Sequence, residues 1–268
     1  MNSMDNLRKI VVGILALTML CLGGCGGTKI LKEPKVLELK NPLAASEDAS
    51  LAASFDWVIV RDGPGTWAKN AAWDEYLLRV HNLSDDGISI ESFVIYDSLD
   101  TMIASSGNRK KLVKGSKAAA KRYKGEGLKV KAGLGGAALV AVGGATYVAG
   151  MGLGVAALAG TGASAATGMV VAVGAILAAP LIVVGGIVRG VNVSKVTNEI
   201  QSRNTNFPLI LGAGDEAAVD IFFPLTPSPK KIEVNYFDAK GTHQLIIDTA
   251  EVLNGLHLRA TEADDDSG

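Results

Sequence analysis

The chain has 268 residues, with 26 Lys and Arg, 27 Asp and Glu, and a formal net charge of −1. This length allows one or two domains, and a composition of 48% hydrophobic and 20% charged residues is too apolar for a disordered chain. The balanced charge argues against nucleic acid as a partner, the 32 Gly lack the period of collagen, and two Cys cannot build a disulfide-rich scaffold.

The first 24 residues have the layout of a secretory signal peptide. Two basic residues precede an apolar run, 10–22, and the run ends in the sequence Leu22, Gly23, Gly24, Cys25. This stretch resembles the signals of bacterial lipoproteins, in which a Leu and two small residues stand before the Cys. An ordinary secretory signal or an uncleaved membrane helix is the alternative, but the run is shorter than the roughly 20 residues of a span.

The resemblance implies cleavage before Cys25, a diacylglyceryl thioether on its sulfur and an acylated new N-terminus. Two or more acyl chains anchor a protein stably, because each buried methylene contributes about 0.8 kcal/mol. In such lipoproteins an Asp after the Cys favours the inner membrane, so Gly26 implies sorting to the outer membrane, facing the periplasm. Since Cys21 would leave with the signal, the mature chain would have no free thiol.

Segment 25–55 combines two Pro with Ala, Ser and mixed charges and has no sustained hydrophobic period, which predicts a tether. Segment 56–107 then shows alternating apolar and polar residues, the pattern of half-buried strands. The predicted strands of this segment are 57–60, 76–81 and 88–96. Ser84-Asp85-Asp86-Gly87 predicts a hairpin turn between the last two, because Gly tolerates positive φ.

The same strand pattern returns in segment 191–260. Its predicted strands are 209–211, 219–223, 232–236, 245–247 and 252–258. Neither segment has enough strands for its own core, but together they suit one antiparallel sandwich. We therefore expect an α+β fold, an antiparallel β-sandwich split by an inserted basic helix and a Gly/Ala-rich apolar helical hairpin. Two separate small sheets are the alternative.

The insertion begins with a basic amphipathic arm, 108–131. It holds ten Lys and Arg against one acid, so its net charge is +9 and the remainder of the chain carries −10. Such an arm could bind anionic lipid headgroups, at about 1 kcal/mol per basic residue near the surface. A solvated helix without a lipid partner is the alternative. The candidate headgroup-binding residues are Lys110, Lys111, Lys114, Lys117, Lys121, Arg122 and Lys124.

The insertion continues as an apolar segment, 132–190, with no charged residue or His from 132 to 188. Because 14 Gly and 16 Ala would hold an isolated helix poorly in water, we expect lipid or close helix packing to stabilise it. The length fits two spans of about 20 residues with a turn near residues 160–164. In composition and spacing it is similar to the glycine-zipper segments of several bacterial envelope lipoproteins.

Small residues in this segment recur at every fourth position, which places them on one helix face and lets two helices approach closely. The candidate helix-packing residues are Gly133, Ala137, Ala141, Ala145, Ala149, Gly144, Gly152, Gly160, Gly174, Ala178 and Gly186. Membrane insertion is the favoured interpretation, and burial against the β-domain or in an oligomer is the alternative. If the β-domain is periplasmic, the basic residues at both ends of the hairpin are periplasmic too. This placement is opposite to the positive-inside rule for an inner-membrane hairpin.

Motifs for catalysis, metals and cofactors are weak. His81, His243 and His257 show no metal-ligand spacing, and no Gly-x-Ser-x-Gly motif is present. We expect no metal and no cofactor. The connection 61–73 contains Gly63, Pro64 and Gly65 followed by Trp67 and Trp73. Capping of the sheet edge is the favoured interpretation of the two Trp, and a possible partner surface is the alternative. The acidic end, 261–268, is expected to be a disordered tail.

Together these patterns predict a lipid-anchored bacterial envelope protein without enzymatic activity, structural or scaffolding in role. Its predicted partners are membrane lipid and either a second copy or another envelope protein, but not nucleic acid. One alternative function is an oligomeric pore or channel, with the apolar hairpins as its wall. A second is a periplasmic hydrolase on the β-domain, since triads are spatial and sequence alone does not exclude them.

Overall fold

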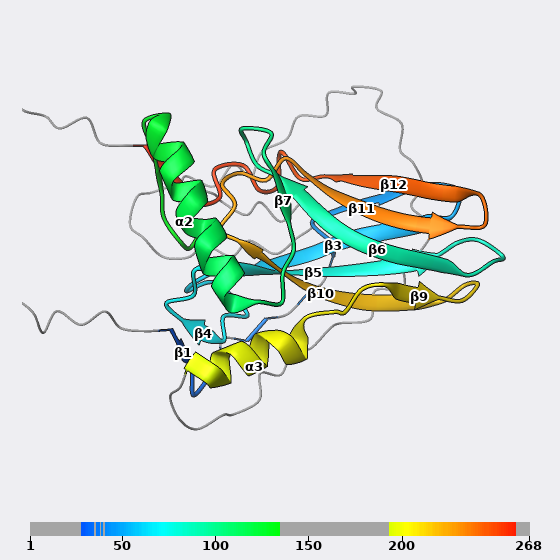
Figure 1. Cartoon of the computed structure of the whole chain (residues 1–268), viewed down its shortest axis with the longest axis horizontal. Helices are drawn as coiled ribbons and strands as arrows, with labels where there is room; N and C mark the ends of the chain where they lie inside the picture. The colour runs from blue at the N-terminus through cyan, green and yellow to red at the C-terminus, as the bar shows by residue number, and fades with distance from the viewer. Residues whose placement is uncertain (1–27, 35, 38, 40, 135–192, 261–268) are drawn as a thin grey trace, which may run out of the picture.

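The structure, a computed structural model, describes residues 28–34, 36, 37, 39, 41–134 and 193–260 (Figure 1). The signal, the lipobox and Cys25, most of the apolar segment and the acidic tail lie outside the described residues. So do all the candidate helix-packing residues except Gly133. That residue has φ of +106° in a bend, so its assignment to a helix face is wrong.

Nine strands form two antiparallel sheets. Sheet 1 has the order β10-β5-β3-β2, and sheet 2 has the order β12-β11-β6-β7, with β9 also paired to β6. The strands of sheet 1 are β2 (Ala44–Glu47), β3 (Leu51–Ile59), β5 (Trp73–Asn82) and β10 (Glu216–Pro224). Those of sheet 2 are β6 (Ile88–Tyr96), β7 (Met102–Ala104), β9 (Leu209–Leu211), β11 (Lys231–Asp238) and β12 (Gly241–Asp248).

Strands from before and after the insertion pair with each other in both sheets. In sheet 1, all nine residues of β10 pair with β5, from Pro224 opposite Trp73 to Glu216 opposite His81. In sheet 2, β6 pairs with both β11 and β9. The expected class, α+β with mostly antiparallel strands, is confirmed, and two separate small sheets are excluded.

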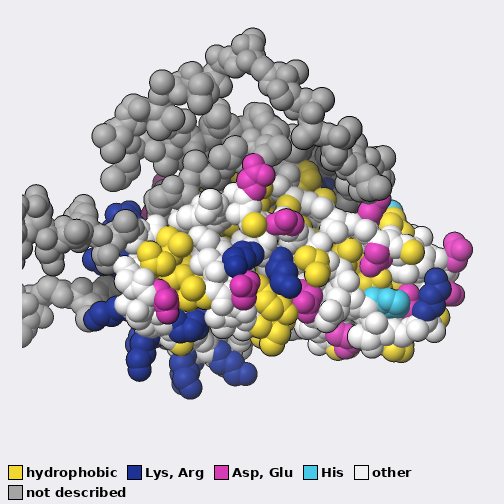
Figure 2. All heavy atoms as spheres, turned by 90° about the horizontal axis from the view of Figure 1, so that it is seen from above, with side chains coloured by type: hydrophobic (Ala, Val, Ile, Leu, Met, Phe, Trp, Pro, Cys, Tyr) yellow, Lys and Arg dark blue, Asp and Glu magenta, His cyan; other side chains and the backbone are white. Residues whose placement is uncertain are grey.

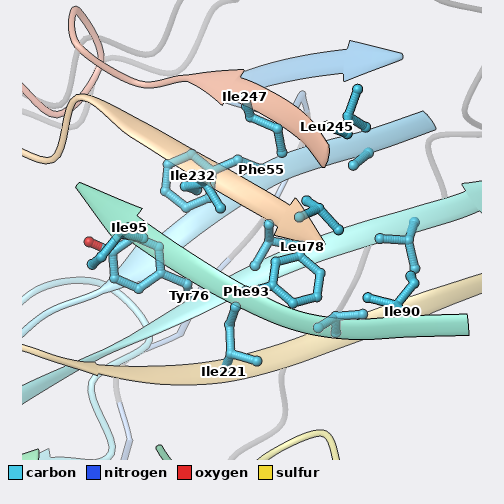
Figure 3. Packing of buried hydrophobic residues seen from close by; sticks show 14 of the residues in the cluster. Phe55, Tyr76, Leu78, Ile90, Phe93, Ile95, Ile221, Ile232, Leu245 and Ile247 are labelled. Atoms are coloured by element: carbon cyan, nitrogen blue, oxygen red, sulfur yellow. The ribbon is translucent and has the colours of Figure 1, made fainter. Parts of the chain in front are cut away.

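One hydrophobic cluster contains residues of both sheets (Figure 3). Along β5, Tyr76 and Leu78 point into this cluster, and Glu75 and Leu77 lie on the opposite face, as the period of two requires. Tyr76 stacks on Phe55 at 5.5 Å between ring centroids and meets Phe223 edge-on at 5.1 Å. Aromatic contacts of this kind add about 0.5–1.5 kcal/mol beyond the burial of area.

Two helices and four short strands gather at one end of the sheets, which we call the helical end (Figure 1). These elements are β1 (Lys29–Ile30), β4 (Ala68–Lys69), α2 (Arg109–Gly125), β8 (Leu128–Val130), α3 (Val193–Arg203) and β13 (Leu258–Ala260). β1 pairs with β4, and β8 pairs with β13. The opposite end, which we call the turn end, carries the β2–β3, β5–β6 and β11–β12 connections.

α2 follows directly from its sequence. Asn108 caps its N-terminus by accepting hydrogen bonds from the backbone N–H groups of Lys110 and Lys111, at 2.9 and 3.3 Å. The helix buries four side chains spaced by four, three and four residues, which is one helix face. They are Leu112, Ser116, Ala119 and Tyr123.

Three predictions about the chain path are wrong. Residues 44–47 and 51–59 are strands of sheet 1, so segment 25–55 is not simply a tether. The turn at 84–87 joins β5 of sheet 1 to β6 of sheet 2 and therefore closes no hairpin. The Asn82 amide fixes this crossing by donating to the carbonyls of Asp86 and Gly212, both at 2.7 Å.

The third error lies near the C-terminus. Residues 251–257 form turns instead of a strand, with Leu253 and Leu256 fully buried at the end of the core. Both side chains lie in the cluster shared by the two sheets. An apolar run of that length therefore closes the core without joining a ladder. The sequence periodicity also did not predict α3, which lies at the start of segment 191–260, where only strands were expected.

Candidate functional site

The helical end is where the described residues next to the three long undescribed segments, 1–27, 135–192 and 261–268, lie. Thr28 follows the N-terminal segment, and its hydroxyl accepts a hydrogen bond from Arg109 of α2 at 3.3 Å. Near the other boundaries, a Cβ on Gly133 would stand 3.3 Å from the carbonyl oxygen of Arg61, α3 contacts β1, and Ala260 pairs with Leu128. The N-terminal segment, the apolar segment and the tail therefore all join the β-domain at this end.

The solvent face of α2 carries a row of lysines, which we call the lysine stripe. At 100° per residue its members fall within about 80° of one another and span about 21 Å of helix. The stripe consists of Lys110, Lys114, Lys117, Lys121 and Lys124, all exposed. None of the five forms an ion pair with a described residue. Figure 2 shows Lys and Arg side chains gathered at this end of the molecule.

Two of the seven candidate headgroup-binding residues lie off this stripe. Lys111 is exposed, about a quarter turn away around the helix. Arg122 donates to the carboxylate of Asp97 at 2.7 Å, and Asp97 is fully buried. Arg122 thus neutralises a buried charge, and its assignment to lipid binding is wrong. No local sequence pattern indicates this ion pair, because Asp97 lies on a connection 25 residues before Arg122.

The Trp pair is buried. Trp67 and Trp73 are each 3% exposed, with 6.5 Å between their ring centroids. This burial agrees with the favoured capping of the sheet edge, and the alternative of a partner surface is wrong. Both Trp side chains belong to a second hydrophobic cluster, the aromatic cluster, on the outer face of sheet 1. Its members are Trp67, Ala68, Ala71, Trp73, Leu112, Val196, Ile200 and Phe222. Side chains of both α2 and α3 therefore pack in the same aromatic cluster.

A buried carboxylate, that of Glu75, contacts the aromatic cluster. Glu75 is 1% exposed and accepts a hydrogen bond from the indole nitrogen of Trp67 at 2.6 Å. Arg203 of α3 approaches the other carboxylate oxygen at 3.4 Å, and its guanidinium lies 5.0 Å from the Trp67 ring centroid. Burial raises the pKa of Glu75 to about 7 despite the opposing effect of Arg203.

The predictions did not include Glu75 or Arg203. The only sequence signal was a pair of adjacent acids, Asp74 and Glu75, between Trp73 and the apolar residues Tyr76, Leu77 and Leu78. Successive residues of a strand point to opposite faces, so both faces of sheet 1 must bury a carboxylate there. Such burial requires partners, and those partners come from distant segments.

The other buried carboxylate of the pair, Asp74, meets His257. The two side chains are fully buried, with 2.7 Å between Nε2 of His257 and a carboxylate oxygen of Asp74. Burial alone would lower the pKa of His257, but Asp74 together with the backbone of Gly133 and Lys131 outweighs burial and raises that pKa. Among the described residues, no hydroxyl or thiol is hydrogen-bonded to the imidazole. The pair is a buried, hydrogen-bonded carboxylate and imidazole at the end of the core, and none of the described hydroxyls bonds to it.

The turn end holds a surface pocket of about 250 Å³. Its lining is Ala49, Ser50, Leu83, Ser84, Asp85, Asp86, Asp238, Ala239 and Lys240. The Asp238 carboxylate already accepts hydrogen bonds from Ser50 and from the backbone N–H groups of Lys240 and Gly241, and His243 lies 2.8 Å away. These contacts close the β11–β12 turn, so Asp238 is a structural group.

Within the described part of the chain, neither helix is long and apolar enough to cross a bilayer. The same residues contain no group of three or more His, Cys, Asp or Glu arranged to hold a metal ion. No protein family model matches the chain, and comparisons with curated proteins and with solved structures find no significant match.

Proposed function

We propose that the protein is a lipid-anchored component of a bacterial cell envelope, with a structural or scaffolding role. The observation that carries this proposal is the gathering of the chain at the helical end. Thr28 is three residues after Cys25, so an acyl anchor on Cys25 would lie within about 11 Å of Thr28. The lipid would then hold the helical end toward the bilayer and the turn end away from it.

The apolar segment supplies the second attachment. We infer that 132–190 forms the expected helical hairpin and either inserts in the membrane or packs against a second copy. Both of its ends leave the β-domain beside the proposed anchor, so one bilayer surface is within reach of both. On this basis we also class the two sheets around one core as a β-sandwich, interrupted after β7 by α2 and the hairpin.

A non-enzymatic role is favoured by the state of the buried titratable groups. Asp74 and His257 are the pair most like part of a catalytic triad, but both are fully buried and bonded to each other. A hydrolase would need a nucleophile within hydrogen-bond reach of the histidine and a path for substrate. The proposed role therefore draws on attachment and not on chemistry, and outer-membrane sorting through Gly26 belongs to the same proposal.

Lipid labelling and fractionation test the anchor. Cells expressing the wild type, Cys25→Ser or Cys21→Ser are grown with radiolabelled palmitate, with the signal kept cleavable. We expect label in the wild type and in Cys21→Ser, whose changed residue leaves with the signal, and none in Cys25→Ser. Absence of label from the wild type, or label retained by Cys25→Ser, would overturn the lipoprotein assignment.

The same Cys25→Ser variant tests the second attachment. Retention in the membrane fraction after an alkaline wash supports insertion of the apolar segment in lipid. Release as a soluble assembly supports its burial between copies of the chain, which sedimentation would detect. Release as a soluble monomer contradicts both forms of the proposal.

A further inference from the structure

We propose that the lysine stripe of α2 is a docking surface for the anionic phosphate groups of the bilayer that holds the anchor. This inference rests on the proposed function and assigns the partner of one face of the helical end. It also narrows that partner from a basic arm of seven residues to one rigid row of five lysines.

The first argument is rigidity. α2 is fixed to the β-domain along its whole length by Leu112, Ser116 and Tyr123. The Ser116 hydroxyl donates to the carbonyl of Ala72 at 2.6 Å and accepts from the N–H of Leu225 at 2.9 Å. Because the opposite face of the helix is held in this way, the five lysines keep their direction relative to the sheets. A surface that binds them therefore also orients the domain.

The second argument is location. The N-terminal end of α2 is tied to Thr28 by Arg109, whose guanidinium also lies 5.9 Å from the Trp73 ring centroid. The chain length from Cys25 to Thr28 allows at most about 11 Å between the anchor and this contact. The stripe thus starts close to the proposed lipid anchor. The anchor would therefore hold the lysines next to the headgroups of the same bilayer.

The third argument is chemistry. The stripe contains lysines alone, and both arginines of the helix are engaged within the protein: Arg122 pairs with Asp97, and Arg109 donates to Thr28. Lysine is a flexible point charge, which suits a delocalised anionic surface, whereas planar recognition of a single phosphate or carboxylate favours arginine. Aromatic side chains, the usual anchors of protein interfaces, are missing from the exposed face of α2, where the uncharged exposed residues are Ala118 and Gly125. A lipid surface is therefore favoured over a protein or a nucleic acid.

Vesicle binding tests the docking surface without the acyl anchor. The full mature chain with Cys25→Ser is titrated with phosphatidylcholine vesicles and with an equal mixture of phosphatidylcholine and phosphatidylglycerol. The stripe variant combines Lys114→Gln, Lys117→Gln and Lys121→Gln. The control variant combines Lys240→Glu and Thr242→Glu, both at the turn end, so the two variants have the same net charge. Gln matches Lys in helix propensity, so α2 is retained, and circular dichroism checks this.

We expect the anionic vesicles to bind the parent chain more tightly than neutral ones. Each lysine near an anionic surface changes the partition coefficient about five-fold, so the stripe variant should lose on the order of 100-fold. The control variant should stay close to the parent, and high salt should remove the difference between the two lipids. Equal loss in both variants would mean that net charge alone is sensed, and would overturn the proposal.

Two further outcomes separate this inference from the proposed function. Binding to pure phosphatidylcholine reports the apolar segment, so its failure counts against insertion and leaves the difference between the two vesicles readable. Equal binding of the parent chain to both vesicles overturns the docking surface while leaving the acyl anchor intact. Tighter binding to duplex DNA than to anionic vesicles at the same ionic strength would also overturn it.

Discussion

α2 and α3, the two helices that flank the apolar segment, rest on the same aromatic cluster but use their cations in opposite ways. The lysines of α2 point to solvent and pair with no described carboxylate, whereas Arg203 of α3 is largely buried and contacts Glu75 and Glu199. Leu112 of α2 and Val196 and Ile200 of α3 enter the cluster together. The difference shows that both helices pack on one apolar cluster, while their ion pairs reach different places. Arg203 of α3 reaches Glu75 in sheet 1, and Arg122 of α2 reaches Asp97 just after β6.

Removing a ring of the aromatic cluster should have the largest effect on stability. Trp67→Ala deletes a buried ring that contacts Trp73, Phe222 and Arg203, and it removes the hydrogen bond to Glu75. We expect the free energy of unfolding to fall by about 3–5 kcal/mol, measured in urea. Hydrogen exchange should speed up in both helices, because both pack on this ring cluster.

The matched control is Phe237→Ala, which removes an aromatic ring that is 51% exposed on sheet 2. Its cost should be less than about 1 kcal/mol, since little apolar area returns to water. If hydrogen exchange became faster in α3 alone after Trp67→Ala, the dependence of both helices on the aromatic cluster would be contradicted.

Titration of Glu75 should separate the two helices. The folded-state pKa of about 7 lies above the ordinary glutamate pKa of 4.5, so folding takes up a proton at any pH between these values. The contribution to stability is therefore present below pH 4.5 and is lost as the pH rises through 7. Since one pKa unit corresponds to 1.36 kcal/mol, the loss is about 3 kcal/mol.

The test compares urea unfolding of the wild type and Glu75→Gln from pH 4.5 to pH 8. The difference between their unfolding free energies should change by about 3 kcal/mol over this range, with the wild type losing more. Other raised groups such as His257 titrate in both proteins and cancel. A constant difference across the range would show that Glu75 stays ionised. Exchange rates in α3 should follow the titration more closely than those in α2.

The smallest of the three effects concerns the close approach of α2 to sheet 1. A Cβ on Gly115 would stand 2.5 Å from Cγ of Pro224 and 2.8 Å from its Cβ, so Gly115→Ala forces the helix outward. Overpacking of this kind costs about 1–3 kcal/mol, more than the gain in helix propensity. Gly125→Ala is the control, because nothing lies within 4 Å of its added Cβ, and it should be neutral or stabilising. Urea unfolding that ranks the two variants the other way would show that α2 is loosely docked.

Sequence alone determined the elements whose signals are local. Alternation predicted β5, β6, β10 and β11, because a strand that buries one face must repeat every two residues. Short apolar runs predicted β9 and part of β12. Charge density placed a helix near 108–131, and Asn108 sits where a cap is required. These signals also gave the α+β class and five lysines that do share one exposed face.

Tertiary structure alone decided which distant groups meet. The turn at 84–87 looks like a hairpin locally, but its two strands belong to different sheets because each finds its partner elsewhere along the chain. Trp67, Glu75 and Arg203 come from three separate elements, and only packing brings an indole, a carboxylate and a guanidinium together. Arg122 looked like its lysine neighbours until Asp97 lay beside it. Local patterns fix period and exposure, but the partner of a buried charge depends on segments far away in the sequence.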